Sequence, residues 1–414
     1  MNFRQLVRPL IPNRTRFIRR AVNPARYLLD SVRLALDASG AAEPTRARPI
    51  RVALVSDGDA ATSEEQFTPF SAYRAELRQR MRLISVHLLL KDVLRAPKLI
   101  LAPFDIVVLK MSFRAPAVEA LRVTRTIRAA IGSKRLIYFD GDDDLCIQWP
   151  GILQYVDLYV KKHAFRDRAQ YLHRFVGKSN LTDFVHRQFG YSFADDPVTQ
   201  ESGPVPCDQL TRLSVGYNLA LDQNILKLYR DARLCSNQGS RENDIVFRGN
   251  VPKGWMSYLR RDIEPALRRL EGSYRVIIPN KRVAPEEYFR EMLSSKICVS
   301  PFGYGEICWR DFEAILCRSL LLKPSMDHVE TNPDIFKPYL TYVPVKWDYS
   351  DLEEKCAYYL THEKERERIT AEAFAILDNF YKNGGFMTAV KDWCDRLGFS
   401  AQTSRLPAGH RNAY

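Results

Sequence analysis

The sequence predicts an α/β protein made of two Rossmann-like domains that face a cleft, followed by a helical C-terminal tail. Short runs of β-branched and other apolar residues alternate with helical segments, which is the pattern of parallel sheets built from βαβ units. This alternation stops near residue 190 and restarts at Asp244. A chain of 414 residues is also long enough for two domains of ordinary size.

In the first half, apolar runs followed by polar helical stretches define the expected elements. The expected strands cover residues 51–55, 82–90, 105–109, 135–139 and 156–160, and the expected helices cover 71–81 and 115–131. Between about 190 and 242 the sequence is dense in turn-forming residues, so we expect the link between the domains there.

The second half repeats the alternation. Its expected strands cover residues 244–247, 274–278, 297–300, 319–322 and 341–343, with helices at about 256–270, 285–295 and 307–317. Apolar residues then recur at helical spacing through about 352–380. These observations divide the chain into a leader (1–48), an N-terminal domain on one side of the cleft (49–215), a C-terminal ligand-binding domain on the other (216–385), and a final helix and tail (386–414).

Composition and cysteine usage indicate a cytoplasmic protein. No apolar run approaches the roughly 18 residues of a membrane span, and we see no secretory signal. None of the eight cysteines forms a Cys-x-x-Cys pair, and most lie in apolar stretches. This usage favours reduced, buried thiols over disulfides or a zinc site.

The leader is strongly basic. Residues 1–48 hold ten arginines against three acidic residues, a net charge of +7 out of +13 for the whole chain. Leu, Ile and Phe residues lie between the arginines, which favours contact with an acidic partner or peripheral contact with an anionic membrane at its inner face. A disordered leader without a target is the alternative. We expect no nucleic-acid partner, because no recognised nucleic-acid motif is present.

The segment 300–315 combines an expected strand end, a loop with Gly303 and Gly305, and a helix. Glycines let a backbone come close to a ligand, and a helix N-terminus attracts phosphate. Arg310 and Glu313 are three residues apart and therefore share a helix face. A guanidinium can grip a diphosphate, and a carboxylate can accept both hydroxyls of a ribose.

The string Arg310-Asp-Phe-Glu-Ala314, followed by the apolar run 320–322, resembles the donor-site segment of GT-B glycosyltransferases. The resemblance is to the group 1 family and to the exostosin-like and spore-maturation-type branches, and it covers about residues 244–382. It implies that Glu313 contacts the donor ribose and Arg310 the phosphates. Residues 247–254 are similar to the loop whose basic residue holds the diphosphate, which implies Lys253, with Arg248 beside it, as ligands.

The segment also departs from the family pattern. Arg318 stands where a small residue is usual, and Gly305 stands eight residues before Glu313, where group 1 enzymes have a glutamate. Glu306 is one step away and is our candidate for that catalytic role. The stereochemical outcome, retaining or inverting, stays open.

The first half carries the remaining catalytic candidates. The cluster Asp140-Gly-Asp-Asp-Asp144 follows an expected strand, where clustered carboxylates can provide a general base, for which we name Asp142, or bind a divalent metal. Its Asp-x-Asp spacing resembles the manganese motif of GT-A glycosyltransferases, while a solvated turn is the structural alternative. His163 follows another expected strand end and is a candidate general base.

The resemblance implies a glycosyltransferase that moves a sugar from a nucleotide-diphosphate donor to a glycan or lipid-linked acceptor, in polysaccharide biosynthesis at the cell envelope. It implies a nucleotide-sugar co-substrate, no other cofactor and no metal. Two alternatives stay open. One is a metal-dependent GT-A-type transferase that uses the 140–144 cluster. The other is a non-catalytic basic binding protein on a degenerate glycosyltransferase fold.

Overall fold

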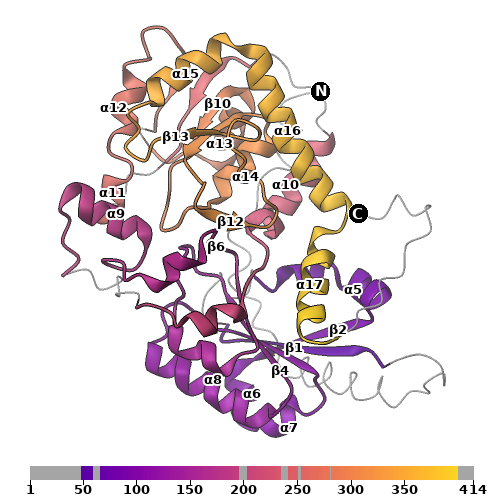
Figure 1. The fold of residues 1–414 in the computed structure, drawn as a ribbon. Coiled ribbons are helices and arrows are strands. Elements are labelled where there is room, and N and C mark those ends of the chain that lie inside the picture. Colours follow the sequence, from indigo (N-terminus) through magenta and orange to yellow (C-terminus); the bar gives the residue numbers. More distant parts are fainter. Residues whose placement is uncertain are drawn as a thin grey trace.

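The computed structural model describes residues 48–58, 66–194, 203–234, 241–249, 253–279 and 281–399. The expected leader therefore lies outside the described residues, apart from Arg48. The chain forms two α/β halves, each built on a parallel sheet, which are stacked one above the other in Figure 1. No helix among the described residues is long and apolar enough to cross a membrane.

The sheet of the first half has six strands in the order β2-β1-β3-β4-β5-β7, and every neighbouring pair is parallel. Its strands are β1 (Ile50–Ser56), β2 (Leu83–Leu89), β3 (Ile106–Lys110), β4 (Arg135–Asp140), β5 (Leu158–Lys161) and β7 (Leu213–Val215). The helices of this half are α4 (Thr68–Ala72), α5 (Arg74–Met81), α6 (Leu90–Val93), α7 (Pro97–Leu101), α8 (Ala117–Ile131) and α9 (Asn180–Phe189). The next helix, α10 (Gln223–Leu234), packs against α14 (Trp309–Leu316) of the second half (Figure 1). The five strands expected here are therefore present, and β7 extends the sheet into the region expected to be a link.

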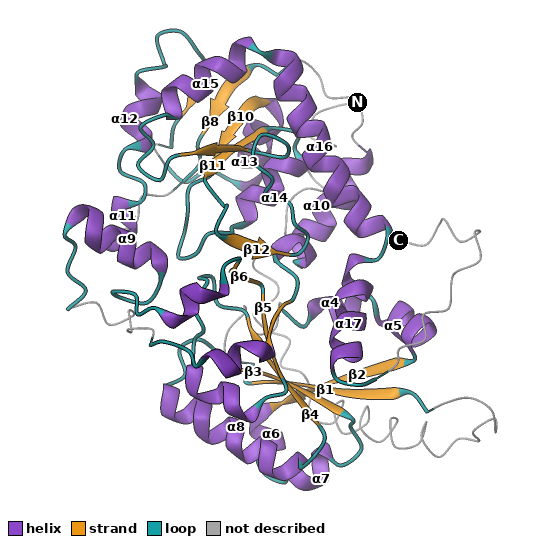
Figure 2. Ribbon diagram, in the orientation of Figure 1, coloured by secondary structure: helices purple, strands orange, loops and turns teal. Residues whose placement is uncertain are grey.

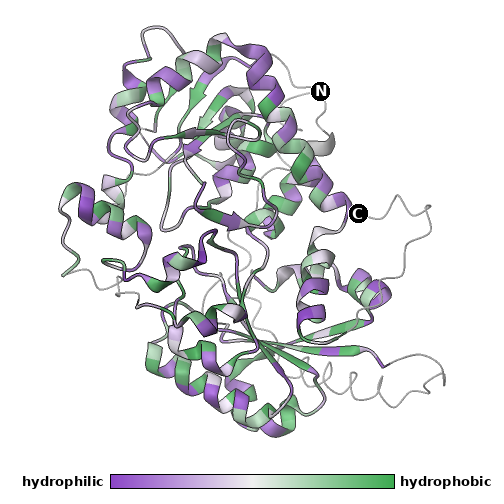
Figure 3. Cartoon of the chain, in the orientation of Figure 1, coloured by the Kyte–Doolittle hydropathy of each residue, from purple (hydrophilic) through white to green (hydrophobic). Residues whose placement is uncertain are grey.

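Both faces of this sheet are covered, because successive side chains of a strand point to opposite faces. Val107 and Leu109 pack in one core cluster with Val123 of α8, whereas Ile106 and Val108 pack in a second cluster on the other face. The strands are correspondingly hydrophobic along their length (Figure 3). This is the composition expected of a parallel sheet buried on both sides.

The sheet of the second half has five parallel strands in the order β13-β11-β10-β8-β9. Its strands are β8 (Asn243–Val246), β9 (Val276–Ile277), β10 (Ser295–Val299), β11 (Leu320–Pro324) and β13 (Val343–Val345). The helices of this half are α11 (Trp255–Tyr258), α12 (Ile263–Arg268), α13 (Pro285–Ser294), α14 (Trp309–Leu316), α15 (Leu352–Thr361) and α16 (Glu363–Lys382). They flank the sheet on its two faces (Figure 2).

The prediction of a single helix at about 256–270 is wrong. The segment forms two short helices, α11 and α12, separated around Arg260. Pro265 explains the break, because a proline is tolerated only in the first turn of a helix. Pro265 is the third residue of α12.

Two further elements join the halves. Strand β6 (His163–Phe165) of the first half pairs antiparallel with β12 (Val329–Thr331) of the second. The last helix, α17 (Gly385–Arg396), leaves the second half and packs on the first sheet, where Phe386 and Trp393 share a core cluster with Phe139. The predicted fold, two Rossmann-like sheets with a helical tail, is confirmed by this topology, and the tail packs back on the first half.

Candidate functional site

The second sheet offers a crevice where its strand order reverses. The chain runs from β8 outward to β9 and then returns to β10 on the other side of β8. In open α/β sheets, ligands bind outside the carboxyl ends of the strands at such a switch point. Arg248 follows β8, and the loop with Gly303 and Gly305 follows β10, so the sequence-predicted donor residues lie at this position.

Arg248 and Arg310 lie together there. Arg310, on α14, donates from Nη2 to the backbone oxygen of Arg248 at 2.9 Å. Arg248 forms a bidentate pair with Glu291 of α13 at 2.5 Å. Among the described residues, the buried atoms Arg248 Nη1 and Arg310 Nε have no hydrogen-bond partner. Buried guanidinium nitrogens without an acceptor are costly, so this pair is suited to an anion.

A third guanidinium, Arg260, approaches the same place, and the sequence analysis did not single it out. Its Nε donates to the backbone oxygen of Phe302 at 2.7 Å, and its Nη2 lies 3.5 Å from the position of a Cβ on Gly303. Burial and the neighbouring charge of Arg310 lower the pKa of Arg260. Positive charges gathered in this way favour a multiply charged anion such as a diphosphate.

Glu313 lies on the same side of α14 as Arg310 and is buried. It accepts a hydrogen bond from the hydroxyl of Tyr288 on α13 at 2.5 Å, between Glu313 Oε2 and Tyr288 Oη. Burial and the Glu313 carboxylate raise the pKa of Tyr288 far above its usual value, so the phenol stays a donor. Tyr288 therefore orients the carboxylate that the resemblance assigns to the ribose.

The start of α14 is partly occupied by its own side chains. The Cys308 N–H donates to Asp311 Oδ2 at 3.0 Å, and the Ser300 hydroxyl donates to Asp311 Oδ1 at 2.6 Å. Lys323 Nζ lies 3.1 Å from Asp311, and both side chains are fully buried. A carboxylate at this helix end competes with a ligand phosphate for the helix dipole. The three arginines are therefore the better-placed anion ligands.

Gly305 lies at the junction of the two halves, and its predicted contact with a ligand stays a prediction. A Cβ at this position would stand 1.4 Å from the backbone oxygen of Asp143, in the first half. Its missing side chain permits close contact between the halves, whereas we expected close contact with a ligand. Gly303 meets no such obstacle, since the nearest atom to its Cβ position is Arg260 Nη2 at 3.5 Å.

Glu306 lies at the same junction and is fully buried. Its Oε1 accepts from Asn180 Nδ2 at 2.8 Å and lies 3.4 Å from His328 Nε2, and its Oε2 lies 3.8 Å from His163 Nε2. Burial opposes ionisation, but the neighbouring imidazoles of His163 and His328 hold the pKa of Glu306 well below its usual range. The carboxylate thus joins groups from both halves.

His163 is buried in β6. Its Nε2 donates to the backbone oxygen of Asp143 at 3.0 Å. Burial lowers its pKa, which keeps the ring neutral. The structure therefore brings two of the three catalytic candidates, Glu306 and His163, together inside the junction of the halves.

The acidic cluster 140–144 is neither a solvated turn nor a set of open carboxylates, because each acid has a lysine partner. Asp140 pairs with Lys161 at 2.9 Å and accepts from the Tyr159 hydroxyl at 2.6 Å. The third catalytic candidate, Asp142, shares Lys178 with Asp144, which lies 2.9 Å from the ammonium group. Asp143 pairs with Lys162 at 2.6 Å.

The electrostatics differ within this cluster. Burial raises the pKa of Asp144 to about 7, and repulsion from Asp142 adds to the effect. Lysine pairing instead dominates for Asp140, where Lys161 and Lys110 overcome burial and lower the pKa. Within the described part of the chain, no group of three or more His, Cys, Asp or Glu side chains has a geometry that could hold a metal ion. Lys253 is exposed and follows the undescribed residues 250–252, so its predicted phosphate contact stays a prediction.

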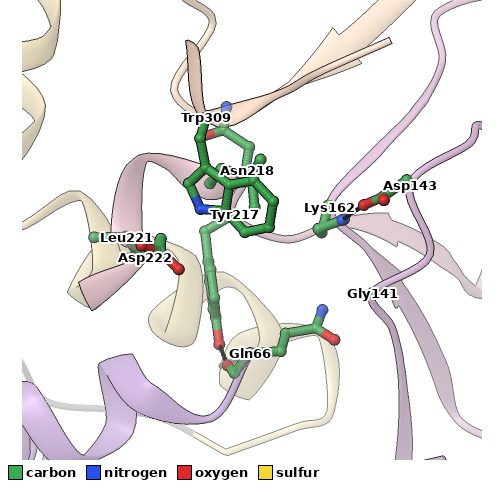
Figure 4. Close-up of a pocket in the computed structure, with 10 residues that line it drawn as sticks. Gln66, Gly141, Asp143, Lys162, Tyr217, Asn218, Leu221, Asp222 and Trp309 are labelled. Atoms are coloured by element: carbon green, nitrogen blue, oxygen red, sulfur yellow. Dashed lines mark hydrogen bonds and ion pairs between the residues drawn. The ribbon is translucent and has the colours of Figure 1, made fainter. Parts of the chain in front are cut away.

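A pocket lies between the halves, beside this cluster (Figure 4). It encloses about 450 Å³, including space open to solvent. The first half supplies the loop after β4 and the end of β5, and α14 supplies Trp309. The remaining wall comes from Gln66 of the first half and from residues within 217–222, in the chain segment between the two sheets.

Comparisons with known proteins give fold-level likeness only. No protein-family model matches the chain, and no curated protein does. Among solved structures, the sucrose-phosphate synthase of Thermosynechococcus elongatus aligns with 84% of this chain and 99% of its own, at 11% identity and a TM-score of 0.45. An alpha-glucosyltransferase in complex with UDP and DNA aligns with 83% and 100%, at 10% identity and 0.42. A UDP-N-acetylglucosamine 2-epimerase aligns with 83% and 98%, at 10% identity and 0.38.

Several site residues escaped the sequence analysis. Arg260 lies in a segment expected to be plain helix, and Gln66 follows an unassigned stretch. Trp309 and His328 stand inside the segments that carry the resemblance, but their residue types alone indicate no role there.

Proposed function

We propose that this protein is a glycosyltransferase that uses a nucleotide-diphosphate sugar as donor and needs no metal ion. The observation that carries the proposal is the pair Arg248 and Arg310, whose buried Nη1 and Nε atoms have no acceptor among the described residues. Arg260 adds a third guanidinium beside the loop at Gly303. Their position at the switch point of the second sheet supports a bound diphosphate.

The chemistry follows from the charges. Transfer of a glycosyl group leaves a nucleoside diphosphate, and negative charge grows on its phosphates as the glycosidic bond breaks. Guanidinium groups fixed around the leaving phosphates stabilise that charge most in the transition state. Glu313, oriented by Tyr288, would accept hydroxyl hydrogen bonds from the ribose.

The metal-dependent alternative has less support. A manganese site needs carboxylate oxygens directed at the ion, whereas Asp140, Asp142 and Asp143 are paired with Lys161, Lys178 and Lys162. These ammonium groups would have to be displaced by a cation. We therefore assign the neutralisation of the leaving group to arginine side chains.

Calorimetric titration with uridine diphosphate tests the proposal. We expect binding that persists in EDTA and weakens ten- to a hundredfold in Arg310→Gln, because a charged hydrogen-bond partner is lost. Arg268→Gln is the matched control, since Arg268 pairs with Glu264 on the exposed face of α12. Binding that requires manganese and disappears in Asp142→Asn would instead favour the metal-dependent alternative.

We further propose a glycan or lipid-linked acceptor, reached from the cytoplasmic face of a membrane through the basic leader. Its net charge of +7 supports salt-sensitive attachment to anionic lipid, at about 1 kcal/mol for each arginine near the surface. Flotation with anionic vesicles should be lost when residues 1–47 are removed. Arg48 is kept because it pairs with Asp105 beside β1. Equal flotation of both forms would argue against the leader as the attachment site.

A further inference from the structure

The pocket between the halves contains two buried polar atoms that the protein does not satisfy. Gln66 is 8% exposed, and its Oε1 has no hydrogen-bond partner among the described residues. The buried indole nitrogen of Trp309 likewise has none within the described ranges. Both residues line the pocket, Gln66 from the first half and Trp309 from the first turn of α14 (Figure 4). The pocket therefore offers one acceptor and one donor that only a ligand can use.

The other polar groups of the pocket are already engaged. Lys162 pairs with Asp143 at 2.6 Å, and Asn218 donates to Thr331 Oγ1 at 2.8 Å. Asp222 accepts from the backbone N–H of Asn224 at 2.8 Å. The Tyr217 hydroxyl donates to the backbone oxygen of Gln66, so its ring contributes an apolar wall. Specific recognition thus depends on Gln66 and Trp309.

The charge of the lining disfavours an anion. Asp143 and Asp222 contribute two carboxylates, and Lys162 contributes one ammonium group. A phosphate or carboxylate placed here would meet a net negative lining. A purely apolar ligand would leave both buried polar atoms without a partner. A neutral molecule with hydroxyl groups satisfies both, because each hydroxyl donates and accepts.

We propose that this pocket binds the uncharged ring of a sugar, with Trp309 Nε1 donating to one hydroxyl and Gln66 Oε1 accepting from another. The rings of Trp309 and Tyr217 would pack against its C–H faces. The inference rests on the proposed function for its biological meaning. Two sources could supply the ring, the glycosyl group of the donor or a sugar unit of the acceptor, and both present the same chemistry.

The test uses the full chain and three sets of probes. Saturation-transfer NMR measures methyl α-glucoside, methyl α-mannoside and methyl β-galactoside against glucose 6-phosphate and glucuronate. Calorimetry measures UDP-glucose against UDP. The variants are Trp309→Phe, which keeps a ring and removes the N–H, and Gln66→Leu. Trp393→Phe is the matched control, because its buried indole N–H also has no partner among the described residues but lies in the core between α17 and the first sheet. Gln154→Leu, in the turn Pro150–Tyr155 packed against α8, controls for the amide.

We expect at least a tenfold loss of sugar binding in both pocket variants and less than a twofold change in both controls. Thermal unfolding should be lowered no more in the pocket variants than in Trp393→Phe, which leaves a cavity in the core. A loss that affects the free methyl glycosides identifies the acceptor as the source. If the pocket variants lower only the extra affinity that UDP-glucose has over UDP, the donor is the source of the ring. If neither measurement separates the pocket variants from the controls, or if the anionic sugars bind better than the neutral ones, the proposal is overturned.

Binding of UDP alone distinguishes this result from failure of the proposed function. If UDP does not bind the wild-type protein, the proposed function fails, and the pocket is then judged on the methyl glycosides only. If UDP binds equally to every variant while no sugar effect appears, the proposed function stands and the sugar pocket does not.

Discussion

Gly305 and Asp143 lie in opposite halves of the protein, yet a Cβ on Gly305 would stand 1.4 Å from the Asp143 backbone oxygen. Gly305→Ala must therefore shift backbone on at least one side of the junction. We expect the free energy of unfolding to fall by about 3 kcal/mol, at the upper end of the usual cost of overpacking. Urea unfolding measures it.

Gly303→Ala, two residues away, provides the comparison. The nearest atom to its Cβ position is the flexible end of Arg260 at 3.5 Å, so its stability should change by less than about 1 kcal/mol. Equal losses in the two alanine variants would show that the loop, and not the contact with Asp143, is responsible.

A second prediction concerns the carboxylate on α14. Glu313→Gln should weaken nucleotide binding about ten- to a hundredfold, because ribose hydroxyls would lose a charged acceptor. Tyr288→Phe removes only the hydrogen bond that orients Glu313, at 2.5 Å, and should weaken binding by less. Calorimetry with UDP separates the two variants. The same affinity for wild type and Glu313→Gln would leave the carboxylate a structural role only.

A third prediction follows from the raised pKa of Asp144, about 7 in the folded protein. The unfolded value is about 3.9, so between about pH 4 and pH 7 the folded state binds the extra proton. The stabilisation that this proton gives to the folded state is complete below pH 4 and is lost as the pH rises to 7. Relative to Asp144→Asn, the wild-type protein should therefore lose up to about 1.4 kcal/mol per pH unit in this window. Unfolding curves at pH 5, 6 and 7 measure the difference, and parallel pH profiles would contradict the assignment.

A fourth prediction concerns Lys323 and Asp311, which form a fully buried ion pair at 3.1 Å. Lys323→Met should cost about 3–5 kcal/mol of stability, because it leaves a buried carboxylate without its counter-ion. The double variant with Asp311→Leu should recover part of that loss. The exposed pair Lys391 and Asp395 on α17 is the reference, for which Lys391→Met should cost less than about 1 kcal/mol. A small effect of Lys323→Met would mean that the pair is not fully buried in solution.

Much of the fold could be predicted from the sequence, because parallel strands buried on both faces read as short apolar runs. Residues 105–109 and 135–139 are such runs, and they form β3 and β4. The position of Arg310 and Glu313 on one side of a helix likewise follows from their spacing of three residues.

The junction between the halves could not be predicted in this way. Gly305 has a sequence context that suits a ligand loop, and only the fold reveals that Asp143, 162 positions earlier, occupies the space beside it. The lysine partners of the acidic cluster could not be predicted for the same reason. Lys161 and Lys162 end a neighbouring strand, and the sequence does not indicate which strands are neighbours.

The return of α17 to the first sheet has a mechanical consequence. The polypeptide crosses between the halves twice, once before β8 and once between α16 and α17. Two covalent connections restrict the relative motion of the halves more than one does, because both segments are anchored at each end. Any opening of the sugar pocket must therefore be accommodated by both segments together, and the contact between Gly305 and Asp143 limits how closely the halves can approach.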